Sequence, residues 1–170
     1  FGDLRLGVNL SAREFDRIDL LDRIRIPLDE FSISPESLEI EITESLLMKD
    51  AENIVARVKH LRSTGVHISI DDFGTRYSSL SYLRRFSVSR IKIDQSFVRD
   101  LRTSNDSFAI IQAIVGIANN FNLSVTVEGV ETEQQVTILK QLGCNEMQGY
   151  YFSRPLPSGR LMEFLQAPLH

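Results

Sequence analysis

Two adjacent carboxylates, Asp71 and Asp72, end an alternating apolar run in the segment HISIDDFGTRYSSL at residues 67–80. Neighbouring like charges repel each other, so a pair of this kind needs a physical reason. A solvated turn would tolerate both acids, and taken alone the pair fits a turn better than a site. A site for divalent metal ions would require both, because such ions prefer oxygen ligands. The rest of the sequence decides between the two interpretations.

Further polar residues stand near the ends of other short apolar runs: Asn9, Glu41, Lys92, Glu128 and, on a weaker run, Gln148. In a parallel α/β barrel the carboxyl ends of the strands meet on one face, so these side chains would converge. Converging carboxylates cost free energy through repulsion and lost hydration, which Mg²⁺, Mn²⁺ or Ca²⁺ would offset. Zinc is disfavoured because His and Cys are scarce at these positions. The set predicts metal-assisted phosphoester chemistry, with Lys92 suited to an anion or a polarised water.

Each of these residues also has a simpler interpretation when it is taken alone. Glu41 fits a solvated strand residue, and Lys92 fits an ion pair with Asp94. Glu128, in the motif EGVE, fits the start of a helix, where the positive end of the dipole favours acids. The side-chain amides of Asn9 and Gln148 fit ordinary hydrogen bonds that cap backbone groups. Only their combination, in order and at the expected strand ends, favours a site.

Strand and helix patterns alternate along the chain and would position this set. Strands are predicted at residues 4–10, 38–43, 67–71, 90–94, 123–128 and, weakly, 144–149. Helical stripes are predicted at 54–61, from 80 onward, at 110–118 and between an N-cap at Thr132 and a stop at Gly143. A helix after Asp19 is expected to break at Pro27. The repeat of roughly 28 residues is that of a strand–helix pair in a parallel sheet.

The predicted strands are apolar on one face only. In residues 67–71, Ile68 and Ile70 alternate with His67, Ser69 and Asp71, and the other strands repeat this pattern. Sheets covered by helices on both faces read instead as continuous apolar runs. The polar faces therefore indicate an α/β barrel with an enclosed, hydrated and charged interior.

The composition indicates one globular domain. The chain has 170 residues, 42% hydrophobic and 25% charged, which is ordinary for such a domain. A net charge of −4 offers no basic surface to duplex DNA or RNA. The single cysteine, Cys144, excludes an internal disulfide and fits a small buried residue. The most apolar stretch, from Phe108, is too short to cross a bilayer, so no membrane contact is expected from this chain.

Six motifs occur in order: VNLSA at 8–12, EITES at 41–45, DDFGTRYSSL at 71–80, KIDQSFV at 92–98, EGVE at 128–131 and QGYYFSRPLP at 148–157. Together they closely resemble the EAL-domain cyclic di-GMP phosphodiesterases, over essentially the whole of residues 1–170. The resemblance implies an α/β fold, a modified (β/α)8 TIM-like barrel. It also implies hydrolysis of cyclic di-GMP to linear pGpG in bacterial signalling, with two Mg²⁺ or Mn²⁺ ions and inhibition by Ca²⁺.

The resemblance assigns a role to each residue of the set. It implies five metal ligands: Asn9, Glu41, Asp71, Asp72 and Glu128. Asp71 would bridge the two ions, so that paired acids would serve paired metals. Lys92 would orient or help to deprotonate the attacking water, and Glu131 would be a second catalytic residue. Gln148 would bind substrate, and Glu44 would steady the loop after Asp72.

Two departures from the family are visible. Arg76 stands where the family often has glycine, and this cation either stays exposed in its loop or reaches a phosphate. The Glu-Ala-Leu signature, whose glutamate is a further metal ligand, and the first two strands are expected to lie before Phe1. The chain then supplies about six of eight barrel strands and, alone, is expected to be poorly active. The alternative function is a cyclic di-GMP receptor or regulatory interaction domain that does not cleave the nucleotide.

The resemblance also implies the partners and the setting of the protein. We expect a homodimer formed near YSSLSYLRRF at residues 77–86, and fusion to sensory or cyclase domains in the parent protein. A cytoplasmic location is expected, which is compatible with a parent protein anchored at the inner membrane.

Overall fold

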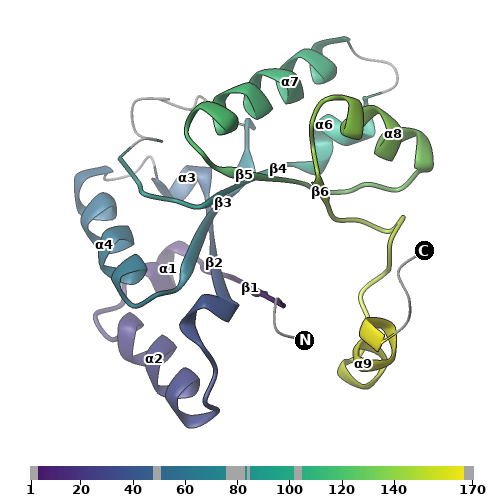
Figure 1. The fold of residues 1–170 in the computed structure, drawn as a ribbon. Coiled ribbons are helices and arrows are strands. Elements are labelled where there is room, and N and C mark those ends of the chain that lie inside the picture. Colours follow the sequence, from purple (N-terminus) through teal and green to yellow (C-terminus); the bar gives the residue numbers. More distant parts are fainter. Residues whose placement is uncertain (1–3, 48–50, 76–82, 84, 102–104, 167–170) are drawn as a thin grey trace.

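Six parallel strands form one sheet in chain order, and the sheet curls into a half-barrel (Figure 1). The computed structural model describes residues 4–47, 51–75, 83, 85–101 and 105–166. The strands are β1 (Leu6–Asn9), β2 (Leu38–Thr43), β3 (His67–Phe73), β4 (Arg90–Ile93), β5 (Ser124–Val127) and β6 (Glu146–Met147). This arrangement confirms the predicted α/β, TIM-like class.

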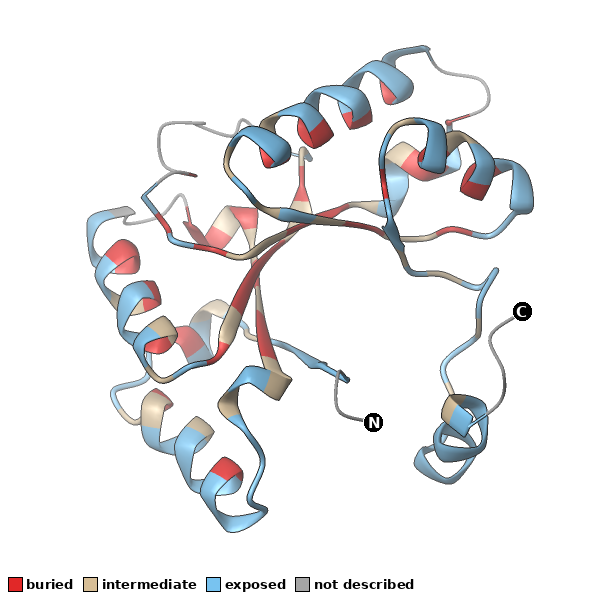
Figure 2. Ribbon diagram, in the orientation of Figure 1, coloured by how far each residue is buried: buried red, intermediate tan, exposed pale blue. Residues whose placement is uncertain are grey.

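Helices connect the strands and cover the outer side of the curl (Figure 1). They are α1 (Ala12–Phe15), α2 (Leu20–Glu30), the 3-10 turn η1 (Pro35–Ser37), α3 (Glu44–Leu47), α4 (Ala51–Ser63), α6 (Gln95–Arg99), α7 (Asn105–Asn120) and α8 (Glu133–Gln141). A further helix, α9 (Ser158–Gln166), follows the last strand and stands apart from this cover (Figure 1). An extended segment separates α9 from the other helices, and no residue of α9 is buried (Figure 2). Within the described ranges, no helix is long and apolar enough to cross a membrane.

The aliphatic face of the sheet forms the core, as the strand pattern predicts. The side chains with 2% exposure or less include Ile40, Ile42, Ile68, Ile70, Ile91 and Ile93. Buried residues line the middle strands and the inward sides of the helices in Figure 2. Burying each such side chain contributes about 1.5–3 kcal/mol, which fixes the strands and leaves their polar face for other uses.

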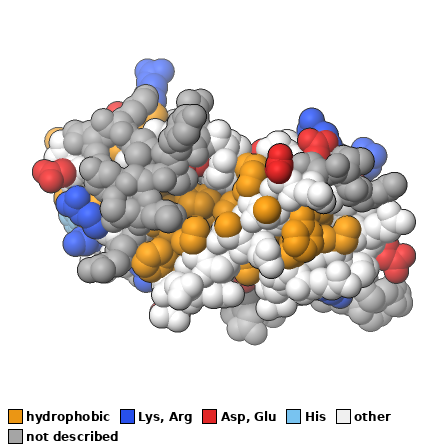
Figure 3. All heavy atoms as spheres, turned by 90° about the horizontal axis from the view of Figure 1, so that it is seen from above, with side chains coloured by type: hydrophobic (Ala, Val, Ile, Leu, Met, Phe, Trp, Pro, Cys, Tyr) orange, Lys and Arg blue, Asp and Glu red, His pale blue; other side chains and the backbone are white. Residues whose placement is uncertain are grey.

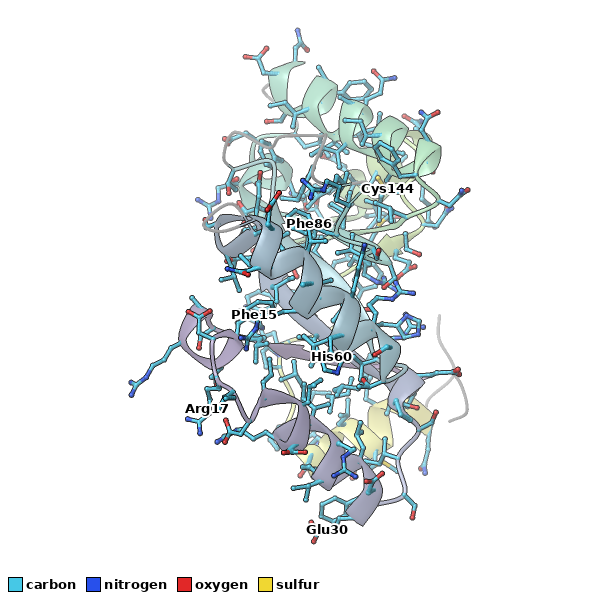
Figure 4. All side chains as sticks on the ribbon, turned by 90° about the vertical axis from the view of Figure 1, so that its left-hand side faces the viewer. Phe15, Arg17, Glu30, His60, Phe86 and Cys144 are labelled. Carbon is cyan, nitrogen blue, oxygen red and sulfur yellow. The ribbon has the colours of Figure 1, made fainter. Side chains whose placement is uncertain are left out.

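Individual side chains show the same division between inside and outside. Phe15 and Cys144 are fully buried, whereas Glu30 stands at the exposed end of α2 (Figure 4). Burial raises the pKa of the Cys144 thiol to about 11. The prediction of a small buried residue at Cys144 is therefore confirmed.

Helix α2 continues through Pro27, so the expected break at this residue was wrong. Proline removes one N–H donor and normally disturbs the preceding turn. The carbonyl that loses its usual donor is that of Arg23, four residues before Pro27, and both residues are exposed, so water can solvate it. The Pro27 carbonyl still accepts a hydrogen bond from the N–H of Phe31 at 3.0 Å.

The predicted boundaries of α8 are confirmed. Thr132 Oγ1 accepts from the N–H of Gln135 at 3.3 Å, and Gln135 Oε1 accepts from the N–H of Thr132 at 3.0 Å. Gly143 follows the helix with φ at 85°, a conformation that favours glycine. Of the stripe predicted from residue 80, Leu83 and Phe86 are buried, and residue 80 lies outside the described ranges.

Strand β1 differs from the other strands because its aliphatic side chains are uncovered. Leu6 and Val8 are 66% and 39% exposed, and within the described residues β1 pairs only with β2. Parallel strands are normally buried on both faces. Among the described residues, β1 instead presents an open edge and an open face.

Candidate functional site

Four charged side chains converge at the carboxyl ends of the strands. Glu41 comes from β2, Asp71 from β3, Lys92 from β4, and Glu128 directly follows β5. Lys92 Nζ lies 2.5 Å from Glu41 Oε2, 2.7 Å from Glu128 Oε1 and 3.7 Å from Asp71 Oδ1. The structure thus brings together four of the residues that the sequence analysis selected.

Lys92 does not form the simple pair with Asp94 that was considered for it. Asp94 is instead the N-cap of α6, where its Oδ1 accepts from the N–H of Ser96 at 3.0 Å. Burial alone would lower the pKa of Lys92, but its hydrogen bonds to Glu128 and Glu41 outweigh burial and raise it. Lys92, only 5% exposed, is therefore a protonated cation at neutral pH.

Negative charge remains in excess around this ammonium. Three carboxylates share the single positive charge of Lys92, which leaves two negative charges uncompensated within the group. Burial raises the pKa of Glu128, and Lys92 offsets that effect only in part. Burial, together with repulsion from Asp71 and Asp94, raises the pKa of Asp72. A divalent cation would relieve this repulsion.

Asp71 and Asp72 lie in a bulge at the end of β3. The pairing of β3 with β4 shifts register between Ile70 and Phe73, and both acids lie in the shifted stretch. Asp72 has a φ of 55°, in the left-handed region that Asp tolerates better than most residues, and its N–H donates to Asp71 Oδ1 at 3.0 Å. Bulges commonly re-aim side chains beside active sites. The pair therefore belongs to a bulged strand end and not to a simple turn.

Glu44 holds the beginning of the loop after Asp72. This glutamate is 3% exposed, and its Oε2 accepts from the N–H of Gly74 at 3.1 Å. Gly74 has a φ of 93°, and a Cβ there would lie 3.1 Å from the Phe97 ring and 3.2 Å from Ile114. The contact is the one that a loop-stabilising role requires, and the role itself stays a prediction. Arg76 and most of residues 77–86 lie outside the described ranges.

Asn9, Glu131 and Gln148 stand around the carboxylate group without joining its ion pairs. Asn9 is the register partner of Glu41 across β1 and β2. Glu131 and Gln148 line, with Glu128 and Tyr150, a cavity of about 240 Å³. Among the described residues, no side-chain hydrogen bond ties any of the three to the group.

The donor set fits hard divalent cations. It consists of carboxylate and amide oxygens, which suit Mg²⁺, Mn²⁺ and Ca²⁺. In the described part of the chain, no three acidic, His or Cys side chains form a ready metal cage. The Lys92 ammonium is the cation that the carboxylates now share, so metal binding would need small movements of these side chains.

The sequence analysis missed a second set of ion pairs, one pleat deeper in the interior. Arg90 Nε lies 3.2 Å from Glu39 Oε2, and Arg90 Nη1 is bonded to Glu146 and, at 2.5 Å, to Thr126 Oγ1. Arg5 also reaches Glu39, at 3.3 Å. The available signal was the shared strand face, which placed these residues in the interior without showing which of them would meet.

Comparison with known proteins agrees with the fold. The family model described as "EAL domain" matches residues 1–155. In Pseudomonas aeruginosa, the bifunctional diguanylate cyclase/cyclic di-GMP phosphodiesterase MucR is 44% identical over 94% of this chain and 23% of MucR. Cyclic di-GMP phosphodiesterase NbdA of the same organism is 44% identical over 96% of this chain and 21% of NbdA. The chain thus spans less than a quarter of these relatives.

Solved structures give the same result. The MucR phosphodiesterase in complex with cyclic di-GMP has a TM-score of 0.91 at 44% identity, over 94% of this chain and 65% of that one. Klebsiella pneumoniae BlrP1, in a manganese and cyclic di-GMP complex, has a TM-score of 0.82 at 33% identity, over 89% of this chain and 39% of that one. With a family model matching residues 1–155 and these neighbours in agreement, the chain belongs to the EAL domain family.

Proposed function

We propose that residues 1–170 act as an EAL domain that hydrolyses cyclic di-GMP to linear pGpG with two Mg²⁺ or Mn²⁺ ions. The observation that carries the proposal is the convergence of carboxylates from three separate strand ends on one buried ammonium, with negative charge in excess. The proposed ligands are Asn9, Glu41, Asp71, Asp72 and Glu128. The manganese and the calcium complexes of BlrP1 with cyclic di-GMP support divalent cations as the ions of such a site.

Lys92 acts as a donor in this mechanism. When bound, divalent ions lower the pKa of a coordinated water and neutralise charge on the phosphate. The ammonium of Lys92, held by Glu41 and Glu128, would orient the attacking water by donating a hydrogen bond to its oxygen. Its raised pKa makes it a poor base in the metal-free protein, so we favour orientation over deprotonation as its role.

The cavity beside Glu128 is the proposed place for the nucleotide. Gln148 offers both donors and acceptors to a base or phosphate, and Glu131 offers acceptors close to the metal ligands. The Tyr150 ring, with the Arg154 guanidinium 4.7 Å from its centroid, forms an exposed aromatic wall of this cavity. Stacking on such a ring suits the flat face of a guanine.

The proposal extends to the protein's setting. The names of the relatives, a bifunctional cyclase and an oxygen sensor among them, support a longer signalling protein with sensory or cyclase domains. A cytoplasmic location is part of the proposal. A homodimer through residues 77–86 is part of the same proposal. Helix α7 exposes Phe108 and Ile110 at 40% and 37%, and hydrophobic side chains reach the surface on this side of the molecule (Figure 3).

The test is a single-turnover assay with the purified protein in excess over cyclic di-GMP. Chromatography should show pGpG with Mg²⁺ or Mn²⁺ and none with a chelator or with Asp71→Asn. Asp106→Asn, the same change at an exposed residue of α7, should match the unsubstituted protein. Binding of cyclic di-GMP without release of pGpG would assign the receptor function instead.

A further inference from the structure

We propose that Arg90, bonded to Glu39 and Glu146, is a positioning residue for the metal–substrate site. It would set the spacing of the strands β2, β4 and β6, whose next inward-facing residues are the proposed site residues Glu41, Lys92 and Gln148. The inference rests on the proposed function, because it names what holds that site in shape. We call Arg90, Glu39, Thr126 and Glu146 the lower layer.

The lower layer joins strands that backbone hydrogen bonds cannot join. In the sheet order, β3 lies between β2 and β4, and β5 lies between β4 and β6. Arg90 on β4 nevertheless bonds to Glu39 on β2 and to Glu146 on β6, and it touches Thr126 on β5 on the way. Such bonds between alternate strands form only when the sheet is curled enough to bring their side chains together. They therefore fix the curvature of the half-barrel.

The lower layer is coupled to the site by strand geometry. Residues two apart on a strand share a face and lie about 6.6 Å apart along it. Glu39 precedes Glu41 by two positions, as Arg90 precedes Lys92 and Glu146 precedes Gln148. A change in the spacing of the lower layer would therefore be passed directly to the residues above it.

Ser69 supplies the room that this arrangement needs. It is the inward-facing residue of β3 between the two layers, fully buried, and its register partners are Glu41 on β2 and Arg90 on β4. Its hydroxyl has no protein hydrogen-bond partner within the described residues. The small side chain leaves room for the longer side chains of its two register partners. A long side chain here would stand in the path between Arg90 and Glu39.

The test compares Mn²⁺ affinity, measured by titration, in folded variants. Arg90→Met should bind Mn²⁺ at least about tenfold more weakly, the loss typical when a residue that orients metal ligands is removed. Arg90→Lys should recover part of the affinity, because an ammonium keeps one charged contact but not the fork. The matched control is Arg25→Met, which removes exposed ion pairs with Asp22 and Asp29 and should keep the original affinity.

The outcomes separate this inference from the proposed function. A purely structural role would lower the melting temperature of Arg90→Met and leave the Mn²⁺ affinity of the folded protein unchanged, which would overturn the inference. If Arg90→Met does not fold, Glu146→Gln decides. Its side chain is 46% exposed, so folding should survive, and an unchanged Mn²⁺ affinity would again overturn the inference. No Mn²⁺ binding by the unsubstituted protein would contradict the proposed function itself, and the inference would fall with it.

Discussion

The substitution Lys92→Met removes the ammonium that three carboxylates share while it keeps most of the side-chain volume. The carboxylates of Glu41, Asp71 and Glu128 are 11%, 13% and 21% exposed, so water reaches them only in part. Breaking a buried ion pair by removing one partner costs about 3–5 kcal/mol. Because some water does reach this group, we expect the lower end, about 3 kcal/mol, in the metal-free protein. At 2–4 °C per kcal/mol for a chain of this size, the melting temperature should fall by about 6–12 °C.

Mn²⁺ should reverse this loss. In the unsubstituted protein an entering ion competes with Lys92 for the carboxylates, whereas in Lys92→Met it meets carboxylates that lack a cation. A ligand at 100 times its Kd stabilises the folded state by about 2.7 kcal/mol, which is close to the expected deficit. The rise in melting temperature on adding Mn²⁺ should therefore be larger in the variant. Hydrolysis should be lost, because the residue that orients the water is gone.

The assay is thermal unfolding with a chelator and with Mn²⁺, run beside a hydrolysis assay. Lys59→Met, at an exposed position of α4, is the matched control and should change neither measurement. Our reasoning is refuted if Lys92→Met is as stable as the unsubstituted protein in chelator. It is equally refuted if Mn²⁺ raises the melting temperature of the unsubstituted protein by more than that of the variant.

Four further predictions concern metal binding, assembly, an added N-terminal segment and pH. Asp71→Asn should weaken Mn²⁺ binding by more than Glu39→Gln does, because Glu39 lies one pleat below the proposed ligands; equal affinities by calorimetry would contradict the assignment. Analytical ultracentrifugation should show a dimer, with an interface of about 1,000 Å² or more, and a monomer at all concentrations would exclude pairing through residues 77–86. Placing the family's N-terminal strands and Glu-Ala-Leu segment ahead of Phe1 should raise cleavage about 100-fold, equivalent to two steps of ~1.4 kcal/mol, and an unchanged rate would contradict this. Burial lowers the pKa of His67 below its usual 6.5. The stability that neutral His67 contributes is present above pH 6.5 and is lost as pH falls through the lowered pKa. The free energy of unfolding, measured with a denaturant at pH 7 and at pH 5, should therefore decline less in His67→Gln than in the unsubstituted protein.

Strand parity made much of this fold predictable. One-sided apolar alternation, as in Ile68 and Ile70, can be satisfied only if helices cover one face and the other face encloses something polar. The location of the charged group followed from the same rule, because parallel strands bring their carboxyl ends to one rim. The rule therefore places Lys92 and Glu128 together, and in the structure Lys92 Nζ lies 2.7 Å from Glu128 Oε1.

Features that depend on how alternate strands meet across the curl could not be predicted in this way. Parity places Arg90 and Glu39 inside the barrel, but their pairing depends on curvature and on the small size of Ser69. The bulge at Asp72 likewise depends on pairing between strands and not on local sequence. The helix through Pro27 shows the opposite error, in which a strong local preference gives way because the affected turn is exposed to water.

The two layers of the interior contain similar residue types but differ in how their charges are compensated. The lower layer with its neighbour Arg5 is balanced: the cations are Arg5 and Arg90, and the anions are Glu39 and Glu146. The upper group sets a single cation, Lys92, against three carboxylates, and Asp72 adds a further acid at its edge. A network that only holds strands together is most stable when its charges cancel, as those of the lower layer do. The uncancelled charge of the upper group has no such structural use, and it is the condition under which a divalent cation gains most by binding.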